Sequence, residues 1–188
     1  TGLVVGIDKS QVMIKEAKRR FHRAVLPVKF YACDAHKLHF NQDQFNGSLC
    51  FSVLTHCEEP AIVISEVLRV LKPGGRLVVL EPDWDTLVLS TGDQYCDEML
   101  TRVLRNSVRH SGIAHQLPTL FTRLGFQYVT AEAAPLTISN YALANDAWRI
   151  EANLAYVVKV GIVSSAEAGG AMRRLRRLEH QFAGGCVV

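Results

Sequence analysis

The sequence has no apolar run of the roughly 18 residues needed to cross a membrane, and no signal-peptide pattern at its start. Its charges are nearly balanced, with 21 basic and 18 acidic residues, so it lacks the one-sided charge typical of nucleic-acid-binding proteins. The five cysteines are odd in number and include no C-x-x-C pair, as is typical of reduced thiols. These absences predict a cytoplasmic protein with neither a membrane nor a nucleic-acid partner.

The remaining composition is that of a globular protein. The 188 residues are 48% hydrophobic, which is enough for a sizeable core. No internal repeat or low-complexity segment interrupts the chain. We therefore predict a single domain over residues 1–188.

The most informative stretch reads LRVLKPGGRLVVLEPDW, residues 68–84. Its start continues a helix predicted from residue 60. Lys72-Pro73-Gly74-Gly75 should end that helix, because proline removes a donor and glycine accepts a positive φ. Residues 77–80 form a continuous apolar run, which is typical of a parallel strand covered on both faces. Glu81 follows this strand, and ligands of open α/β sheets bind at such carboxyl ends.

Strands and helices alternate in the rest of the first half. Apolar or alternating runs predict strands over residues 3–7, 28–33 and 48–53, and a helix is predicted over 10–23. Acidic or small polar residues follow each of these strands. This order predicts an α/β fold with a parallel sheet.

The second half changes character. We expect helices over 97–111, 118–124, 145–160 and 164–182, a strand over 126–131, and the first residues of a further strand at 186–188. Gly125 should end the second of these helices and Gly184-Gly185 the last, which a capping box at Ser164 opens. Residues 137–183 then form a helical, lid-like insert within the domain.

Five segments, taken in order, resemble a known family. They read VVGIDKS, CDAHKLHF, VLTHC, VLRVLKPGGRLVVLEPDW and LFTRLGF, and they extend from about residue 3 to residue 134. The chain resembles the class I S-adenosylmethionine-dependent methyltransferases of small molecules. The resemblance implies a Rossmann-like, doubly wound α/β fold with a mostly parallel sheet, S-adenosyl-L-methionine as cofactor, and methyl transfer to a small molecule.

The resemblance also implies which residues meet the cofactor. Asp8 matches the acid that binds both ribose hydroxyls, a role that suits a carboxylate because charge-assisted hydrogen bonds are strong. Asp34 and Ala35 match the pair beside the adenine. Four further residues match positions around the cofactor: Lys9 and Ser10 beside the adenosine, Phe51 and Ser52 near the methionine part. The alternative is that the two acids are ordinary residues at strand ends.

The candidate general base is His56, which follows a strand end where a substrate could meet it; a structural role is the alternative. For the substrate site we expect Glu81, Trp84 and Trp148, in a pocket built from residues 81–85, the helix after 97 and residues 137–160. Apolar side chains in and beside these segments indicate a hydrophobic small molecule: Leu87, Val88, Leu89, Ile138 and Leu143. No metal site is expected, because the histidines and cysteines show no repeated ligand spacing.

One part of the family pattern has no counterpart. The Gly-rich loop between the family's first strand and first helix is absent, and Thr1-Gly2 directly precede the equivalent of the second strand. We therefore expect a fragment truncated at the N-terminus and also at the C-terminus; a natural variant that closes its sheet differently is the alternative. Removing the first strand from the family's sheet would leave two buried strands without a neighbour, and unsatisfied backbone groups cost about 1 to 3 kcal/mol each.

Two other functions stay open at this point. A non-catalytic, methyltransferase-like binding or scaffolding subunit would keep the sheet while losing cofactor contacts. A nucleotide-dependent oxidoreductase would also have an acid after its second strand, yet it should show G-x-G-x-x-G and Tyr-x-x-x-Lys, and neither occurs. The expected partner is a small-molecule substrate, and no motif indicates an oligomeric state.

Overall fold

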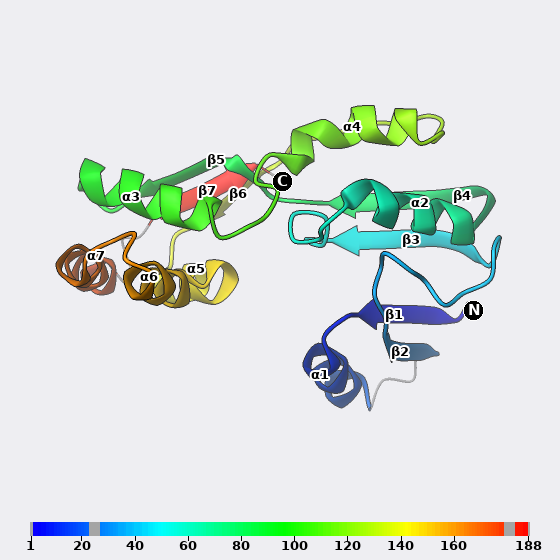
Figure 1. Cartoon of the computed structure of the whole chain (residues 1–188), viewed down its shortest axis with the longest axis horizontal. Helices are drawn as coiled ribbons and strands as arrows, with labels where there is room; N and C mark the ends of the chain where they lie inside the picture. Colours follow the sequence, from blue (N-terminus) through cyan, green and yellow to red (C-terminus); the bar gives the residue numbers. More distant parts are fainter. Residues whose placement is uncertain (1, 23–26, 179–182, 188) are drawn as a thin grey trace. The chain divides into compact units, whose positions relative to one another are not determined.

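A computed structural model of the protein describes residues 2–22, 27–178 and 183–187. The chain forms two compact units, whose helices and strands are labelled in Figure 1. Unit 1 contains residues 1–50, 59–79 and 121–126, and unit 2 contains residues 51–58, 80–120 and 127–188.

Unit 1 begins with a strand, a helix and a second strand. β1 (Val4–Asp8) pairs in parallel with β2 (Val28–Ala32), in a register that places Asp8 opposite Ala32. α1 (Gln11–Phe21) follows β1, and Ser10 caps it by accepting the backbone N–H of Met13. These predicted elements are confirmed, because serine at an N-cap satisfies a donor that the first helical turn leaves free.

A second pair of strands follows. β3 (Phe45–Phe51) lies beside β4 (Leu71–Leu80), and their arrows point the same way in Figure 1. α2 (Pro60–Val70) connects them and begins at Pro60, as predicted, since the first helical turn has no acceptor for an N–H at that position. Within the described part of the chain, the β1–β2 and β3–β4 pairs are separate sheets.

The end of α2 differs from the prediction. The helix ends at Val70 and β4 already begins at Leu71, so residues 72–75 lie in the strand instead of forming a turn before it. Gly74 does adopt the expected positive φ, +77°. Gly75 is required for another reason, because a Cβ there would lie 2.8 Å from the backbone oxygen of Lys72.

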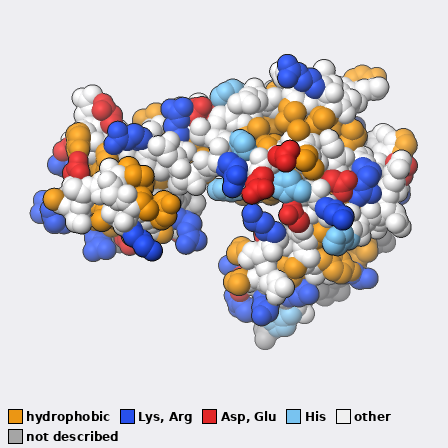
Figure 2. Space-filling view, viewed as in Figure 1, with side chains coloured by type: hydrophobic (Ala, Val, Ile, Leu, Met, Phe, Trp, Pro, Cys, Tyr) orange, Lys and Arg blue, Asp and Glu red, His pale blue; other side chains and the backbone are white. Residues whose placement is uncertain are grey.

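The expectation that this strand is covered on both faces is wrong for this chain. Burial alternates along β4, and Val78 is 58% exposed. On β3, Leu49 is 73% exposed, and Phe51 is also exposed. Figure 2 shows hydrophobic side chains at the surface among charged ones. Apolar side chains on one face of the β3–β4 pair therefore reach the solvent, while Leu77 of β4 packs against the core that α2 contributes to.

Unit 2 is built on an antiparallel sheet, in the order β5 (Asp83–Ser90), β7 (Ala183–Val187) and β6 (Pro135–Ile138). α3 (Gln94–Arg105) packs against β5, and α6 (Ile150–Lys159) packs against α3 and α7 (Ser165–Arg177). The described chain has two more helices, α4 (Ile113–Arg123) and α5 (Tyr141–Trp148). Side chains from β5, β6 and the helices α3, α5, α6 and α7 share one hydrophobic core.

Several expectations for the strands of the second half are wrong. Residues 126–131 form no strand, and β6 lies further along the chain. Residues 83–90 form β5, a strand that the sequence pattern did not predict. Gly184 and Gly185 lie inside β7 instead of ending a helix, and this strand begins at Ala183. A Cβ on Gly185 would collide with the backbone oxygen of Leu136, so the close approach of β6 requires glycine there.

The predicted helices also change in extent. α3 ends at Arg105 instead of residue 111, and α4 begins at Ile113 instead of Pro118. The helix expected over 145–160 is two helices, α5 and α6, because Arg149 adopts a φ of +52° between them. No helix of the described ranges is long and apolar enough to cross a lipid bilayer.

Other expectations for this half are confirmed. Gly125 follows α4 with a φ of +93°, and Ser164 and Glu167 form the capping box of α7. The expected end of the last helix at Phe182 lies outside the described residues. Residues 137–183 fall in unit 2, where they contribute strand residues as well as helices. Their role as an insert within a single domain remains a prediction.

Candidate functional site

The first part of the expected cofactor site lies where β1 ends. Asp8 is the last residue of this strand, and its Oδ1 accepts the backbone N–H of Ser10 at 2.7 Å. Ser10 also caps α1, so the turn between strand and helix fixes the direction of the carboxylate. Lys9 lies between the two and is exposed.

Asp34 follows the end of the neighbouring strand. The register of β1 and β2 aligns Asp8 with Ala32, and the Cys33 N–H donates to the backbone oxygen of Asp8 at 3.0 Å. Asp34 and Ala35 therefore come directly after the carboxyl end of β2, beside the carboxyl end of β1. The structure thus brings both predicted acids to one edge of a parallel pair, where ligands of α/β sheets bind.

His36 orients Asp34, a role that was not predicted from the sequence. Its backbone N–H and its Nδ1 both bond to Asp34 Oδ1, at 2.9 and 2.7 Å. The Glu59 N–H donates to His36 Nε2 at 3.3 Å, so Nδ1 carries the ring proton. The backbone N–H of His36, and then its ring, lower the pKa of Asp34. Asp34 is thereby favoured as an ionised acceptor, and its Asp-x-His spacing is the signal that could have shown this.

The end of β3 carries the residues expected near the methionine part of the cofactor. Phe51 is the last residue of this strand and is exposed. Ser52 donates its N–H to the backbone oxygen of Leu80 at 2.9 Å and then adopts a φ of +49°, an uncommon left-handed conformation for serine. The chain turns there, and its next three backbone N–H groups point to Glu81.

Glu81 accepts all three of these hydrogen bonds. Val53 and Leu54 donate to its Oε1 at 2.7 Å each, and Thr55 donates to its Oε2 at 3.3 Å. Glu81 is only 3% exposed. Burial raises the pKa of Glu81, and the three N–H donors oppose that rise. Both oxygens are occupied, so Glu81 shapes the turn after Ser52, and its expected contact with a substrate remains a prediction.

The other expected residues of unit 2 lie in different environments. His56 is exposed on the turn that Glu81 orders, and its N–H donates to the backbone oxygen of Val53 at 3.0 Å. Trp84 and Trp148 instead belong to one hydrophobic core. Trp84 is 6% exposed, and its Nε1 has no hydrogen-bond partner among the described residues. Their contact with a substrate remains a prediction.

The apolar side chains expected to line the substrate pocket do not share one environment. Leu87 and Leu89 alternate along β5 into the core of unit 2, which also contains Ile138. Val88 and Leu143 are exposed. These side chains stabilise unit 2 or reach solvent, and their hydrophobicity alone gives weak support for a hydrophobic substrate.

Comparison with known proteins supports the predicted resemblance. Residues 2–79 match the family of methyltransferase domains. An uncharacterized 37.1 kDa protein in a transposon of Streptomyces fradiae is 33% identical over 98% of this chain and 52% of its own length. A ubiquinone/menaquinone biosynthesis C-methyltransferase of Desulfotalea psychrophila is 41% identical over 42% of this chain and 31% of its own length. The chain spans about half the length of the first relative. The match to the second relative covers about a third of that protein.

The fold agrees with this assignment. The YcgJ protein of Bacillus subtilis superposes with a TM-score of 0.61 over 98% of this chain and 78% of that protein, at 20% identity. Residues 2–79 thus match a methyltransferase domain, and the chain has a Rossmann-like α/β fold. The predicted resemblance and fold class are thereby confirmed, and the methyltransferase match argues against the alternative of an oxidoreductase.

Proposed function

We propose that this chain binds S-adenosyl-L-methionine and transfers its methyl group to a small, hydrophobic molecule. The observation that carries the proposal is the pair of oriented carboxylates, Asp8 and Asp34, at the adjoining carboxyl ends of β1 and β2. In each carboxylate one oxygen is held by a backbone N–H group. Such preorganisation matters because binding then costs little side-chain entropy.

The two carboxylates suit the two polar ends of an adenosine. Asp8 accepts hydrogen bonds from the ribose hydroxyls, and Asp34 accepts one from the exocyclic amine of the adenine. Ala35 has a side chain small enough to leave room for the ring. Lys9 and Ser10 flank the adenosine, while Phe51 and Ser52 are the candidates for contacts with the methionine part.

The reaction requires a nucleophilic atom of the substrate in line with the methyl carbon. That atom forms the new bond as the carbon–sulfur bond breaks, and the electron pair of the broken bond passes to sulfur, which leaves S-adenosylhomocysteine. The sulfonium is a strong methyl donor, so alignment supplies much of the acceleration. A nucleophile that starts protonated also needs a base, and His56 is the candidate because it is exposed on the turn that Glu81 orders.

The relatives support the methyl donor more strongly than the acceptor. The enzyme of Desulfotalea psychrophila is named for C-methylation in ubiquinone and menaquinone biosynthesis, and a quinone-like acceptor would agree with a hydrophobic substrate. That match covers only 42% of this chain and 31% of that enzyme, however. We therefore propose the class of acceptor, a hydrophobic small molecule, and no particular member of it.

Calorimetric titration with S-adenosyl-L-methionine tests the proposal. Asp8→Ala should weaken binding by about 1.5 to 3 kcal/mol, the range for a hydrogen bond to a charged group, which is about 10- to 150-fold in affinity. Asp146→Ala is the matched control, because Asp146 is an exposed acid on α5. Unchanged affinity of Asp8→Ala would remove Asp8 from the site. A folded wild-type chain that binds neither the cofactor nor S-adenosylhomocysteine would refute the proposal for this chain.

A further inference from the structure

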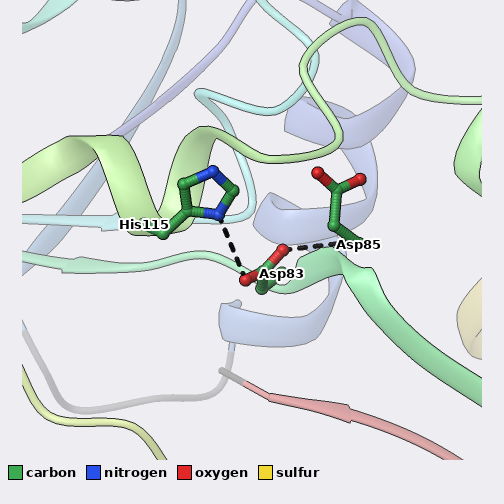
Figure 3. A group of neighbouring side chains, drawn as sticks. All are labelled: Asp83, Asp85 and His115. Carbon is green, nitrogen blue, oxygen red and sulfur yellow. Dashed lines mark hydrogen bonds and ion pairs between the residues drawn. The ribbon is translucent and has the colours of Figure 1, made fainter.

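Three potential metal ligands from two distant segments meet in unit 2. Asp83 and Asp85 lie at the start of β5, and His115 lies in the first turn of α4 (Figure 3). His115 Nδ1 is 3.4 Å from Asp83 Oδ2, although the two residues are 32 positions apart in the sequence. One ligand atom of each residue lies within 4.8 Å of the other two. Histidine and cysteine spacing could not reveal this group, since two of its members are aspartates.

The backbone holds the two segments together independently of these side chains. The Trp84 N–H, between the two aspartates, donates to the backbone oxygen of Ser111 at 3.1 Å. The Asp85 N–H donates to Asp83 Oδ1 at 3.1 Å, which leaves Asp83 Oδ2 for the imidazole. Main-chain contacts therefore hold the two segments together and orient the Asp83 carboxylate before any ion binds.

Gly112 keeps an atom-sized space open between two of the ligands. A Cβ on this residue would lie 2.6 Å from Asp85 Oδ2, 2.6 Å from His115 Cε1 and 3.1 Å from His115 Nε2. The backbone of Gly112 has no positive φ, so its conformation would accept any residue. Glycine is required here because any side chain would fill the space between the Asp85 carboxylate and the His115 imidazole.

Charge and exposure also suit a cation at this place. The two aspartates bring two negative charges together, and Arg105 Nε compensates one of them through Asp85 Oδ1 at 2.6 Å. The side chain of Asp83 is 13% exposed, whereas that of His115 is 57% exposed. A bound ion would thus have a buried carboxylate on one side and room for water ligands on the other.

We propose that Asp83, Asp85 and His115 bind a divalent transition-metal ion such as Mn²⁺ or Zn²⁺. Ligands about 2.1 Å from such an ion are about 3.0 to 3.4 Å apart at octahedral or tetrahedral angles, which matches the distance between Asp83 and His115. A set of two carboxylates and one imidazole favours Mn²⁺ or Zn²⁺ over Ca²⁺ and Mg²⁺, which prefer oxygen alone. The ion would tie the start of β5 to the start of α4.

Metal titration of the full chain tests this proposal without any methyl acceptor. After treatment with EDTA and its removal, MnCl₂ is titrated while free Mn²⁺ is followed by electron paramagnetic resonance, and ZnCl₂ binding is followed by calorimetry. We expect one ion per chain and a higher melting temperature with metal, because a ligand of the folded state stabilises it. His115→Ala and Asp83→Asn should abolish this binding, whereas His39→Ala, which changes an exposed histidine of unit 1, should not.

Gly112→Ala separates the proposed site from a general loss of structure. Its Cβ should displace Asp85 or His115 and weaken metal binding by about 10- to 100-fold, the range for residues that orient metal ligands. Gly170→Ala is the matched control, because a Cβ there meets no atom within 4 Å. Circular dichroism of the metal-free variants checks their fold. Absence of binding to the wild type, or binding that survives in both His115→Ala and Asp83→Asn, would overturn the proposal; neither outcome depends on cofactor binding.

Discussion

Glu81→Gln tests the ordering of the turn after β3 by changing a single group. Val53 and Leu54 donate to Oε1 of Glu81, and Thr55 donates to Oε2. Glutamine has nearly the same shape and keeps one carbonyl oxygen, so two of these hydrogen bonds can persist. Its amide NH₂ must then face the Thr55 N–H, which places a donor against a donor.

The expected loss follows from these contacts. One buried N–H left without an acceptor costs about 1 to 3 kcal/mol, and two hydrogen bonds to a charged oxygen become weaker neutral ones, at about 1 kcal/mol each. The change also removes the cost of burying a carboxylate; because burial outweighs the N–H donors and raises the pKa of Glu81, this gain offsets the weakening of the two hydrogen bonds. We therefore expect Glu81→Gln to lower the free energy of unfolding by about 1 to 3 kcal/mol, the cost of the unsatisfied N–H.

Urea unfolding at neutral pH measures this loss, with Glu132→Gln as the control because Glu132 is exposed. Hydrogen exchange should become faster at the Val53, Leu54 and Thr55 amides. Burial raises the pKa of Glu81 above its usual 4.5, so ionisation costs stability in the folded state. The advantage of the wild type over Glu81→Gln should therefore be larger below pH 4.5 and diminish as the pH rises through the folded-state pKa. Equal unfolding midpoints for the two proteins would refute this account of Glu81.

Two further predictions concern unit 1. Gly74→Val and Gly75→Val should each lower the free energy of unfolding by about 1 to 3 kcal/mol. Valine at residue 74 resists the φ of +77°, and the Cβ of valine at residue 75 would collide with the backbone oxygen of Lys72. Urea midpoints like that of Gly170→Ala would contradict this. Glu66→Gln should destabilise the protein except at low pH: the hydrogen bond from Arg69 lowers the pKa of Glu66 to about 2, so its contribution is present above pH 4.5 and is lost as the pH falls toward 2. A difference in unfolding free energy that does not shrink in acid would count against this role.

Predictions that depend on local chemistry are confirmed. Ser10 and the capping box at Ser164 mark helix starts because each serine accepts an N–H group only a few residues away. Pro60 starts α2 for a similar local reason. Asp8 and Asp34 come together because the strand, helix and strand between them form one continuous stretch of sequence. In all of these cases the partner is nearby in the chain, and the sequence pattern is sufficient.

Errors arise where the partner is far along the chain. β7 lies between β5 and β6, so Ala183 pairs with Ser90 and Gly184 pairs with Ile138. An apolar run such as 87–89 looks the same in a strand and in a pocket wall, and only the distant partner distinguishes the two. Gly184 and Gly185 likewise resemble a helix end, although the close approach of β6 explains Gly185 here.

The candidate site shows the same limit. The position of Glu81 after an apolar strand correctly marks a residue of special chemistry, yet its N–H donors lie 26 to 28 residues earlier in the chain. Whether its carboxylate faces a ligand or the backbone was therefore not visible in the sequence. His115 is a stronger example, because its partner Asp83 is 32 residues away and no spacing rule connects them.

The apolar face of the β3–β4 pair is left exposed, whereas the acids at the strand ends already have hydrogen-bond partners. Leu49 and Val78 remain largely in water, and a side chain of this kind gains about 1.5 to 3 kcal/mol when it is fully buried, so the exposed face of β3–β4 contributes little to stability. The polar groups at the strand ends are already satisfied: His36 holds Asp34 within unit 1, and the turn after Ser52 holds Glu81 within unit 2. The charged parts of the candidate site are thus ordered by hydrogen bonds within each unit. Adenosine binding at Asp8 and Asp34 should accordingly depend on those hydrogen bonds more than on what covers the apolar face.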